Sequence, residues 1–384
     1  MISFNSVNML VGATGYRRAF GHLAIALFFL CSVKAQEGCG TQLPTGDSRE
    51  QMMLLEDEFQ QSAHRMDRST DRSTTVQHVP VRINIVSQSN GTGGYSPTAA
   101  EADLARVSDV FRPGAGIDFY VCGSVGIASD EWFNVEDQSE KDAIYNSSYY
   151  QRGVVNLFVV DDIGGANGYA YLPPGRAILV MRASRMATTT FEHEMGHIFH
   201  LYHTHEDEFG LENDNGDNCA TAGDLLCDTE ATPDLNGGGI FSCCPFGCVG
   251  AVCDYIGVCT DPNGDYYGSP EVDNYMSYGA YPSCRDRFSP MQLAKMNYTS
   301  LNVASRGAPV AISAPDLGST TYAAGAYWNS SQINSAVDLT TRTPVPASTT
   351  FTLSSGGSVK LSPPFRYSAT ATNPGMLARI SACP

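Results

Sequence analysis

The stretch from 191 to 203 constrains this chain more than any other segment. It contains the pattern H-E-x-x-H, with its two histidines at His193 and His197. On a helix, side chains four residues apart project from the same face, so both imidazoles can reach one Zn²⁺ ion. Glu194 lies beside the first histidine, where it can act as a general base toward a water molecule on the metal. The pattern therefore predicts a helix that carries a catalytic zinc site.

A third zinc ligand is needed, and His203 is the candidate. On a continued helix its side chain would point about 240° around from that of His197. His203 can therefore bind the same ion only if the chain turns sharply between the two residues. His200 and His205 are predicted to be bystanders, because a lone buried histidine is more often a satisfied core residue than a ligand.

A histidine six residues after H-E-x-x-H resembles the metzincin signature H-E-x-x-H-x-x-G-x-x-H. The segments 194–197 and 201–204 resemble more specifically the pappalysin (cytophagalysin) branch of secreted metalloproteases. The family's glycine, which makes the sharp turn, is His200 here. Glycine adopts a left-handed conformation freely, and histidine is among the other residues enriched there. We expect a strained turn at this position.

The resemblance covers roughly residues 76–301 and implies an α+β fold with a metzincin-like catalytic domain. That domain has a twisted mixed sheet, a backing helix, an active-site helix and an irregular, disulfide-rich lower part. The implied activity is that of a zinc metalloendopeptidase, in which Zn²⁺ on three histidines polarises water and the substrate carbonyl. Glu194 then takes the proton of the water and passes it to the leaving amine.

The segment 274–278 resembles the metzincin Met-turn. The resemblance implies that Met276 lies beneath the zinc and that Tyr278 can swing to the scissile carbonyl. A thioether fills space under the histidines without competing strongly for the metal, and a phenol can stabilise an oxyanion. An ordinary core methionine is the alternative interpretation.

An acidic stretch, 206–218, is followed by the segment 223–229, which resembles a G-D-x-V-x-D-T-P element of pappalysins. Carboxylate oxygens suit Ca²⁺, and the family has calcium there, so Asp224 and Asp228 are candidate calcium ligands. A solvated acidic loop is the alternative. The twelve-residue ligand spacing of an EF-hand is missing.

The N-terminus has the layout of a secretory signal peptide, with two arginines, an apolar run at 23–33 and small residues before a cleavage site. We predict a signal peptide at 1–35 and a propeptide at 36–75, cleaved near Arg68 or Arg72. An ordinary N-terminal arm is the alternative to a propeptide. The mature protein is then secreted and extracellular.

Twelve cysteines in an exported chain predict disulfide bonds. Cys31 leaves with the signal peptide, so an odd number remains and at least one thiol is unpaired. Cys39 begins a Cys-Gly-Thr sequence that resembles the cysteine-switch element of pappalysin propeptides, which implies that it binds the zinc in the proform. Pairing with another cysteine, such as Cys383, is the alternative.

Five further cysteines crowd a glycine-rich stretch. Disulfides are favoured over a thiolate zinc site there because the chain is exported. The five residues are Cys243, Cys244, Cys248, Cys253 and Cys259.

Apolar patterning predicts strands at 81–85, 117–121, 154–160 and 177–181, and helices at 51–66, 97–112 and 290–302. The first strand alternates and is expected to be half-buried, whereas 154–160 is nearly all apolar and is expected to be central. Ser96 caps the second helix, which should stop before Pro113. Ser289 opens the last helix with a capping box.

A glycine-rich segment, 163–173, precedes the strand at 177–181. The resemblance implies that it leads into the edge strand over the cleft, to which an extended peptide can add as a further strand. A simple loop with a glycine turn is the alternative. After a catalytic domain at 76–304, residues 305–384 change in composition and predict a small β-rich accessory module, with strands near 356–365 and 376–383.

Forty acidic residues against 23 basic ones give a formal charge of −17. This balance argues against nucleic acid or an anionic membrane as a partner, and the mature form has no membrane span. The expected partners are protein or peptide substrates bound in an extended form. A zinc-stabilised extracellular binding or adhesion protein without turnover is the alternative, and His200 is the feature that favours it. The sequence carries no signal of oligomeric state.

Overall fold

The computed structural model describes residues 38–66, 76–235, 248–278, 281–303, 327–335, 351–361 and 376–380. The predicted signal peptide, the predicted cleavage region, Cys243, Cys244 and Cys383 lie outside the described residues.

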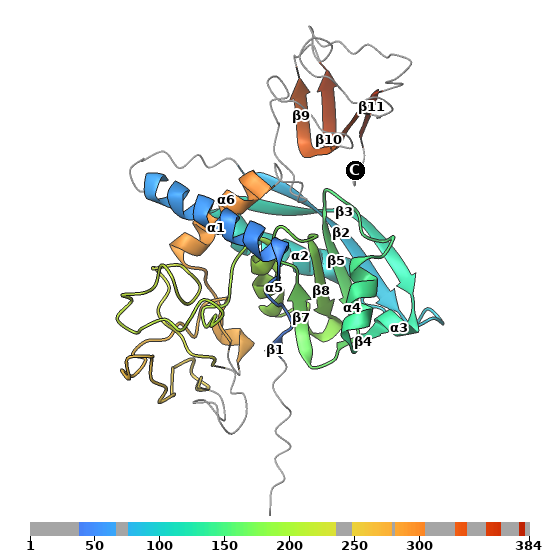
Figure 1. The fold of residues 1–384 in the computed structure, drawn as a ribbon. Coiled ribbons are helices and arrows are strands. Elements are labelled where there is room, and N and C mark those ends of the chain that lie inside the picture. The colour runs from blue at the N-terminus through green and yellow to red at the C-terminus, as the bar shows by residue number, and fades with distance from the viewer. Residues whose placement is uncertain are drawn as a thin grey trace, which may run out of the picture. The chain divides into compact units, whose positions relative to one another are not determined.

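A six-stranded mixed sheet, in the order β1-β7-β8-β5-β2-β3, organises the chain (Figure 1). Four neighbouring strands run parallel, β7 is antiparallel to β8, and β1 runs parallel to β7. The strands are β1 (Gly38–Cys39), β2 (Gln77–Ser87), β3 (Ile117–Ala128), β5 (Val155–Val160), β7 (Ala166–Ala170) and β8 (Ile178–Arg182). Two short strands, β4 (Asn134–Val135) and β6 (Asp162–Ile163), pair separately.

Strand β5 is buried over its whole length and lies between β8 and β2, which confirms the prediction of a central strand. Its residues alternate between two cores. Val155, Leu157 and Val159 pack in one cluster with helices α2 (Pro97–Ala115) and α5 (Thr190–Ile198). On the other face, Phe158 and Val160 pack with residues of α3 (Asp130–Phe133) and α4 (Gln138–Tyr145).

This covering of both faces corrects one expectation. Strand β2 was expected to be half-buried because Arg82 and Asn84 alternate with apolar residues, but Asn84 is fully buried. The alternation predicted a solvent-facing side, whereas the second core cluster lies on that side of the sheet.

Helix α2 begins as predicted, because Ser96 accepts a hydrogen bond from the backbone N–H of Ala99. The prediction that it stops before Pro113 is wrong, since the helix continues to Ala115. A proline lacks only its own N–H, and so near the end of a helix it removes one hydrogen bond. The stop is made by Gly116, whose φ of 65° is left-handed.

Two other helices flank the sheet. Helix α6 (Pro290–Asn302) has the predicted capping box between Ser289 and Gln292 and ends where expected. Helix α1 (Asp47–Met66) begins four residues earlier than the predicted start at 51. Its first turn carries Asp47 and Glu50, whose negative charge is favourable at a helix N-terminus.

Between α5 and α6 the described residues contain little regular structure, as expected for the lower part. Isolated bridges join Val249 to Tyr255 and Thr260 to Tyr266. Disulfides join Cys219 to Cys227 and Cys253 to Cys284, and Cys248 and Cys259 are also disulfide-bonded. These bonds exclude thiolate zinc at Cys248, Cys253 and Cys259.

Toward the C-terminus, three strands form a separate sheet in the order β11-β10-β9. They are β9 (Tyr327–Ser335), β10 (Phe351–Leu361) and β11 (Met376–Ile380). The last two overlap the strands expected from the sequence. In the part of the chain that the structure describes, no helix is long and apolar enough to cross a membrane.

Candidate metal centre

Helix α5 presents His193 and His197 on one buried face, with ring centroids 4.9 Å apart. The Nδ1 atom of His193 donates to the carbonyl of Tyr275 at 2.7 Å, and that of His197 donates to the carbonyl of Leu201 at 2.8 Å. These bonds fix both ring orientations and direct each Nε2 toward the same point, as is usual for histidines that bind metal.

The chain turns at His200, whose φ is 72°. The backbone N–H of Leu201 donates to the carbonyl of Gly196, which closes the turn. His203 is thereby brought back beside the helix, so that its Nε2 lies 3.2 Å from Nε2 of His197. The strained turn expected from the sequence is present, even though the residue is histidine.

Four side chains converge at this point. One candidate ligand atom from each of Cys39, His193, His197 and His203 lies within 4.8 Å of all the others. Three imidazole nitrogens and a thiol sulfur form a donor set that Zn²⁺ takes in tetrahedral sites. The Nε2 atom of His193 is buried without a hydrogen-bond partner, which a metal ion would satisfy. The residues present therefore fit zinc.

Cys39 is a free thiol in the structure, so the alternative of a disulfide to Cys383 is not formed. Its Sγ lies 3.5 Å from Nε2 of His197 and 3.3 Å from Oε2 of Glu194. Burial, and then the negative charge of Glu194, raises the pKa of this thiol well above its ordinary value. A divalent cation acts in the opposite direction and favours the thiolate.

The histidines are held in the form that binds metals. Burial lowers the pKa of both His193 and His197 well below the ordinary value, and the neighbouring histidines add to the shift. Both imidazoles are therefore neutral at pH 7, with a lone pair on Nε2.

Glu194 lies beside the four converging side chains and is fully buried. Its Oε2 accepts hydrogen bonds from the Thr41 hydroxyl at 3.1 Å and from the Cys39 thiol. Burial raises the pKa of Glu194 to about 7, although these two hydrogen bonds oppose the shift. A carboxyl group with a pKa near neutrality is suited to receive and return a proton.

Strand β7 forms the wall of the site within the glycine-rich segment. A Cβ atom at Gly168 would lie 2.8 Å from Cγ of Glu194, so only glycine lets the strand approach the carboxylate this closely. The strand at 177–181, which was expected to be the edge strand, is β8 and lies inside the sheet between β7 and β5. Strand β7 is in turn covered by β1, the outermost strand.

The chain's own residues 38–41 occupy this edge. Strand β1 pairs with β7, and the N–H of Gly40 donates to the carbonyl of Gly168 at 2.8 Å. The Thr41 hydroxyl accepts from the N–H of Ala170 at 2.8 Å while it donates to Glu194. An extended segment of the chain itself is thus bound at β7, whereas peptide binding was expected at the strand 177–181.

The two Met-turn residues also lie at the site. Met276 is fully buried, and a Cβ atom at Gly196 of α5 would lie 2.6 Å from its sulfur. The Tyr278 hydroxyl is 3.3 Å from Nε2 of His203 and donates to the Cys39 carbonyl at 3.3 Å. His205 stacks on His203, and its ring centroid lies 4.2 Å from that of Tyr278, but it does not belong to the converging group.

Sequence reasoning missed Arg285, which is almost fully buried behind His193. Its guanidinium donates to the carbonyl of Ser277 at 3.2 Å and lies 3.5 Å from the Thr190 hydroxyl and from Nδ1 of His193. Arg285 thereby ties the Met-turn to the start of α5. No periodic pattern marks this residue, and its only signal is a basic side chain shortly after the Met-turn.

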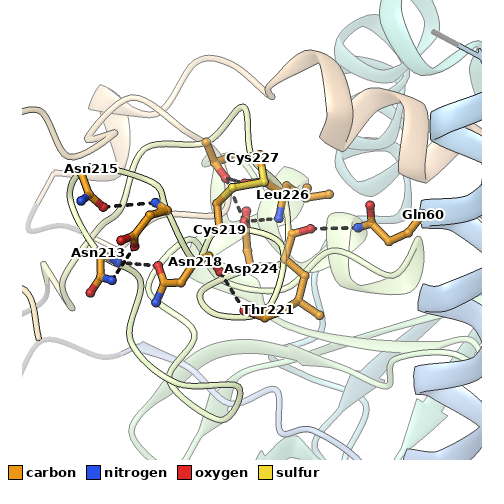
Figure 2. The surroundings of a disulfide bond; sticks show 12 residues. Gln60, Asn213, Asn215, Asn218, Cys219, Thr221, Asp224, Leu226 and Cys227 are labelled. Carbon is orange, nitrogen blue, oxygen red and sulfur yellow. Dashed lines mark hydrogen bonds between the residues drawn. A yellow bond between two sulfur atoms is a disulfide. The ribbon is translucent and has the colours of Figure 1, made fainter. Parts of the chain in front are cut away.

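The two candidate calcium ligands make bonds within the protein. Oδ1 of Asp224 accepts from the N–H of Leu226 and from the Thr229 hydroxyl, beside the Cys219–Cys227 disulfide (Figure 2). Both oxygens of Asp228 are engaged at the start of α6, by the Ser289 hydroxyl and the N–H of Met291. Among the described residues, neither aspartate joins a group of three or more converging ligands. Calcium stays a prediction.

No protein-family model matches the chain. An extracellular metalloprotease of Colletotrichum graminicola is 26% identical over 280 residues, which cover 67% of this chain and 88% of that protein. Extracellular metalloproteases of Podospora anserina and Neurospora crassa are each 25% identical, over 68% and 67% of this chain and 87% and 86% of their own lengths.

Among solved structures, metalloproteinase-II from Bacteroides fragilis aligns with a TM-score of 0.25 at 12% identity. The alignment covers 42% of this chain and 50% of that one.

Proposed function

We propose that this protein is a secreted, zinc-dependent endopeptidase of the metzincin clan, pappalysin branch, which hydrolyses peptide bonds of extended protein or peptide substrates. The observation that carries the proposal is the convergence of His193, His197 and His203 beside the buried carboxyl group of Glu194. The names of the relatives, extracellular metalloproteases, agree with it.

Zinc on the three histidines would supply Lewis-acid polarisation of the scissile carbonyl and of a water molecule. Glu194 takes the proton of that water and passes it to the leaving amine, for which a pKa of about 7 suits both steps. The Tyr278 hydroxyl, already within hydrogen-bond reach of a bound carbonyl oxygen at Cys39, stabilises the developing oxyanion.

Strand β7 would align the substrate. Its backbone bonds residues 38–41 now, and an extended substrate uses the same free edge once they leave. We therefore infer that the described form is a latent zymogen, with Cys39 in the position that the reacting water needs.

The rival reading of an inactive zinc-stabilised binding protein loses its main support. It depended on His200 replacing the turn glycine, and the turn forms with histidine in it. With histidine at position 200, the Nε2 atoms of His197 and His203 still lie 3.2 Å apart, as binding to one metal ion requires.

The test is Glu194→Gln in protein freed of its N-terminal segment and loaded with zinc. We expect zinc content to be retained and hydrolysis of a quenched peptide library to fall by a factor of about 10² to 10⁴, since the base is lost while the ligands remain. Glu101→Gln, an exposed carboxyl on α2, is the matched control and should leave the rate unchanged. Zinc-loaded protein that cleaves nothing in the library would refute the proposal.

A further inference from the structure

Helix α1 lies against the catalytic part of the chain through one continuous face. Met52, Leu55 and Phe59 are buried and are spaced three and four residues apart, as on one side of a helix. Met52 packs in a cluster with Leu172, Tyr202 and Leu225, while the ring of Phe59 lies 5.8 Å from that of Tyr298 on α6. We call the surface formed by Leu172, Tyr202, Leu225, Lys295 and Tyr298 the helix groove.

An ion pair is buried at the centre of this contact. Nζ of Lys295 lies 2.5 Å from Oε2 of Glu56, and both side chains are almost completely inaccessible to solvent. The ammonium group also lies 4.2 Å from the centre of the Tyr202 ring. Glu56 comes from the predicted propeptide and Lys295 from the catalytic part, so the pair joins the two.

A bound helix without a carboxylate at this point would bury the ammonium group of Lys295 without a counter-charge. A buried charge that loses its partner is strongly unfavourable, more so than an exposed one. The groove is therefore selective for a helix that carries a carboxylate between apolar side chains, as Glu56 lies between Met52 and Phe59.

Further contacts extend along the same helix. Nε2 of Gln60 donates to the carbonyl of Leu225 and to Oε1 of Glu56, each at 2.9 Å. Near the start of α1, Arg49 pairs with Glu208 at 3.1 Å. In contrast, β1 contributes a strand of only two residues, and residues 39–41 are held at the site by a few hydrogen bonds.

We propose that the helix groove is a metal-independent binding site for α1, which keeps residues 38–66 on the protein after the chain is cut between α1 and β2. The importance of this binding for latency rests on the proposed function, whereas the binding itself does not. Cutting the chain abolishes the high effective concentration of a tethered segment, so the affinity of the groove decides whether the segment leaves. Cleavage alone then does not open the site, and α1 must also be displaced or degraded.

The experiment uses the full chain with Glu194→Gln to prevent self-digestion and with a recognition site for a sequence-specific protease inserted between residues 67 and 75. After cutting, gel filtration in the presence of a zinc chelator measures retention of the labelled N-terminal fragment. We expect the fragment to co-elute with the rest of the protein. Its release by the chelator alone would overturn the proposal, because Cys39 and its metal would then be the anchor.

Two variants on adjacent residues of α1 test the ion pair. Glu56→Gln should release the fragment at least about a hundredfold faster, because it leaves Lys295 buried without a counter-charge. Asp57→Asn makes the same change of charge on the exposed side of the helix and should alter the release rate less than about twofold. Equal release from the two variants would overturn the role of Glu56.

A competition experiment avoids any fault in folding caused by Glu56→Gln. A synthetic peptide of residues 42–66, which lacks Cys39, is added to the cut Glu194→Gln chain with Glu56 unchanged. It should displace the labelled fragment, and the E56Q peptide should require about a hundredfold higher concentration. Failure of the unsubstituted peptide to compete at any concentration would refute the groove as a binding site.

Discussion

His200 combines an unfavourable backbone with favourable side-chain contacts, so its replacement separates the two contributions. Its φ of 72° costs an L-residue other than glycine about 1 to 2 kcal/mol. Against this, the ring is fully buried and its Nε2 lies 2.8 Å from the Tyr202 hydroxyl. The two substitutions to compare are His200→Gly and His200→Ala.

The contribution of the side chain is the larger one. Loss of the hydrogen bond beside a buried hydroxyl costs about 1 to 3 kcal/mol, and the cavity left by the ring adds about 2 kcal/mol or more. Relief of backbone strain by glycine returns about 1 to 2 kcal/mol, and the greater freedom of the unfolded chain takes back about 0.4 to 1 kcal/mol. We therefore expect His200→Gly to lower the free energy of unfolding by about 1.5 to 5 kcal/mol.

His200→Ala loses the same ring contacts but keeps the left-handed strain, so it should be about 1 kcal/mol less stable than His200→Gly. Urea unfolding of the zinc-loaded chain, followed by circular dichroism, gives all three values. If the alanine variant is as stable as the glycine variant, the turn carries no strain. If the free energy of unfolding of the glycine variant exceeds that of the unsubstituted protein, the side-chain contacts of His200 stabilise the fold by less than the backbone strain costs.

His203→Ala should reduce zinc content in native mass spectrometry whereas His205→Ala should not, and the reverse order would show that the third ligand is misassigned. Cys39→Ala should give the uncut chain partial activity toward a quenched peptide, because residues 38–41 are then held at β7 by hydrogen bonds alone; a proform that stayed inactive until cut would exclude the thiol as the main cause of latency. Arg285→Met should lower the free energy of unfolding by about 2 kcal/mol, because a charged donor to a buried carbonyl is lost, and an unchanged urea midpoint would contradict this. Burial raises the pKa of Asp224 to about 7, so between roughly pH 4 and 7 the folded chain holds a proton that the unfolded chain has released. Stability should therefore fall as pH rises through this window, less steeply in Asp224→Asn, and added calcium should reverse the fall only if the ion binds there.

Local features of the site could be predicted from sequence because they depend on spacing. The i, i+4 histidines need only a helix, and the helical segment at Ser289 needs only its capping box. The sharp turn before His203 followed from geometry, since a continued helix could not bring that residue back.

Features that depend on packing between distant segments could not be predicted. Asn84 is buried because α3 and α4 cover a face that its own strand pattern marks as exposed. The pairing of Glu56 with Lys295, and the position of Arg285 behind His193, join residues far apart in the chain. A sequence pattern of period two or 3.6 records which face is apolar, but not which partner lies against it.

The contact between Gly168 and Glu194 has a consequence for how a bound chain is aligned. Gly168 pairs with Cys39 across the β1–β7 ladder, and a Cβ atom on it would lie 3.1 Å from the carboxyl carbon of Glu194. Whichever residue of a bound strand stands opposite Gly168 is therefore the one presented to Glu194. A shift by one residue along β7 would turn each side chain to the other side of the sheet. The register of a bound strand against Gly168 therefore determines which of its peptide bonds lies next to Glu194.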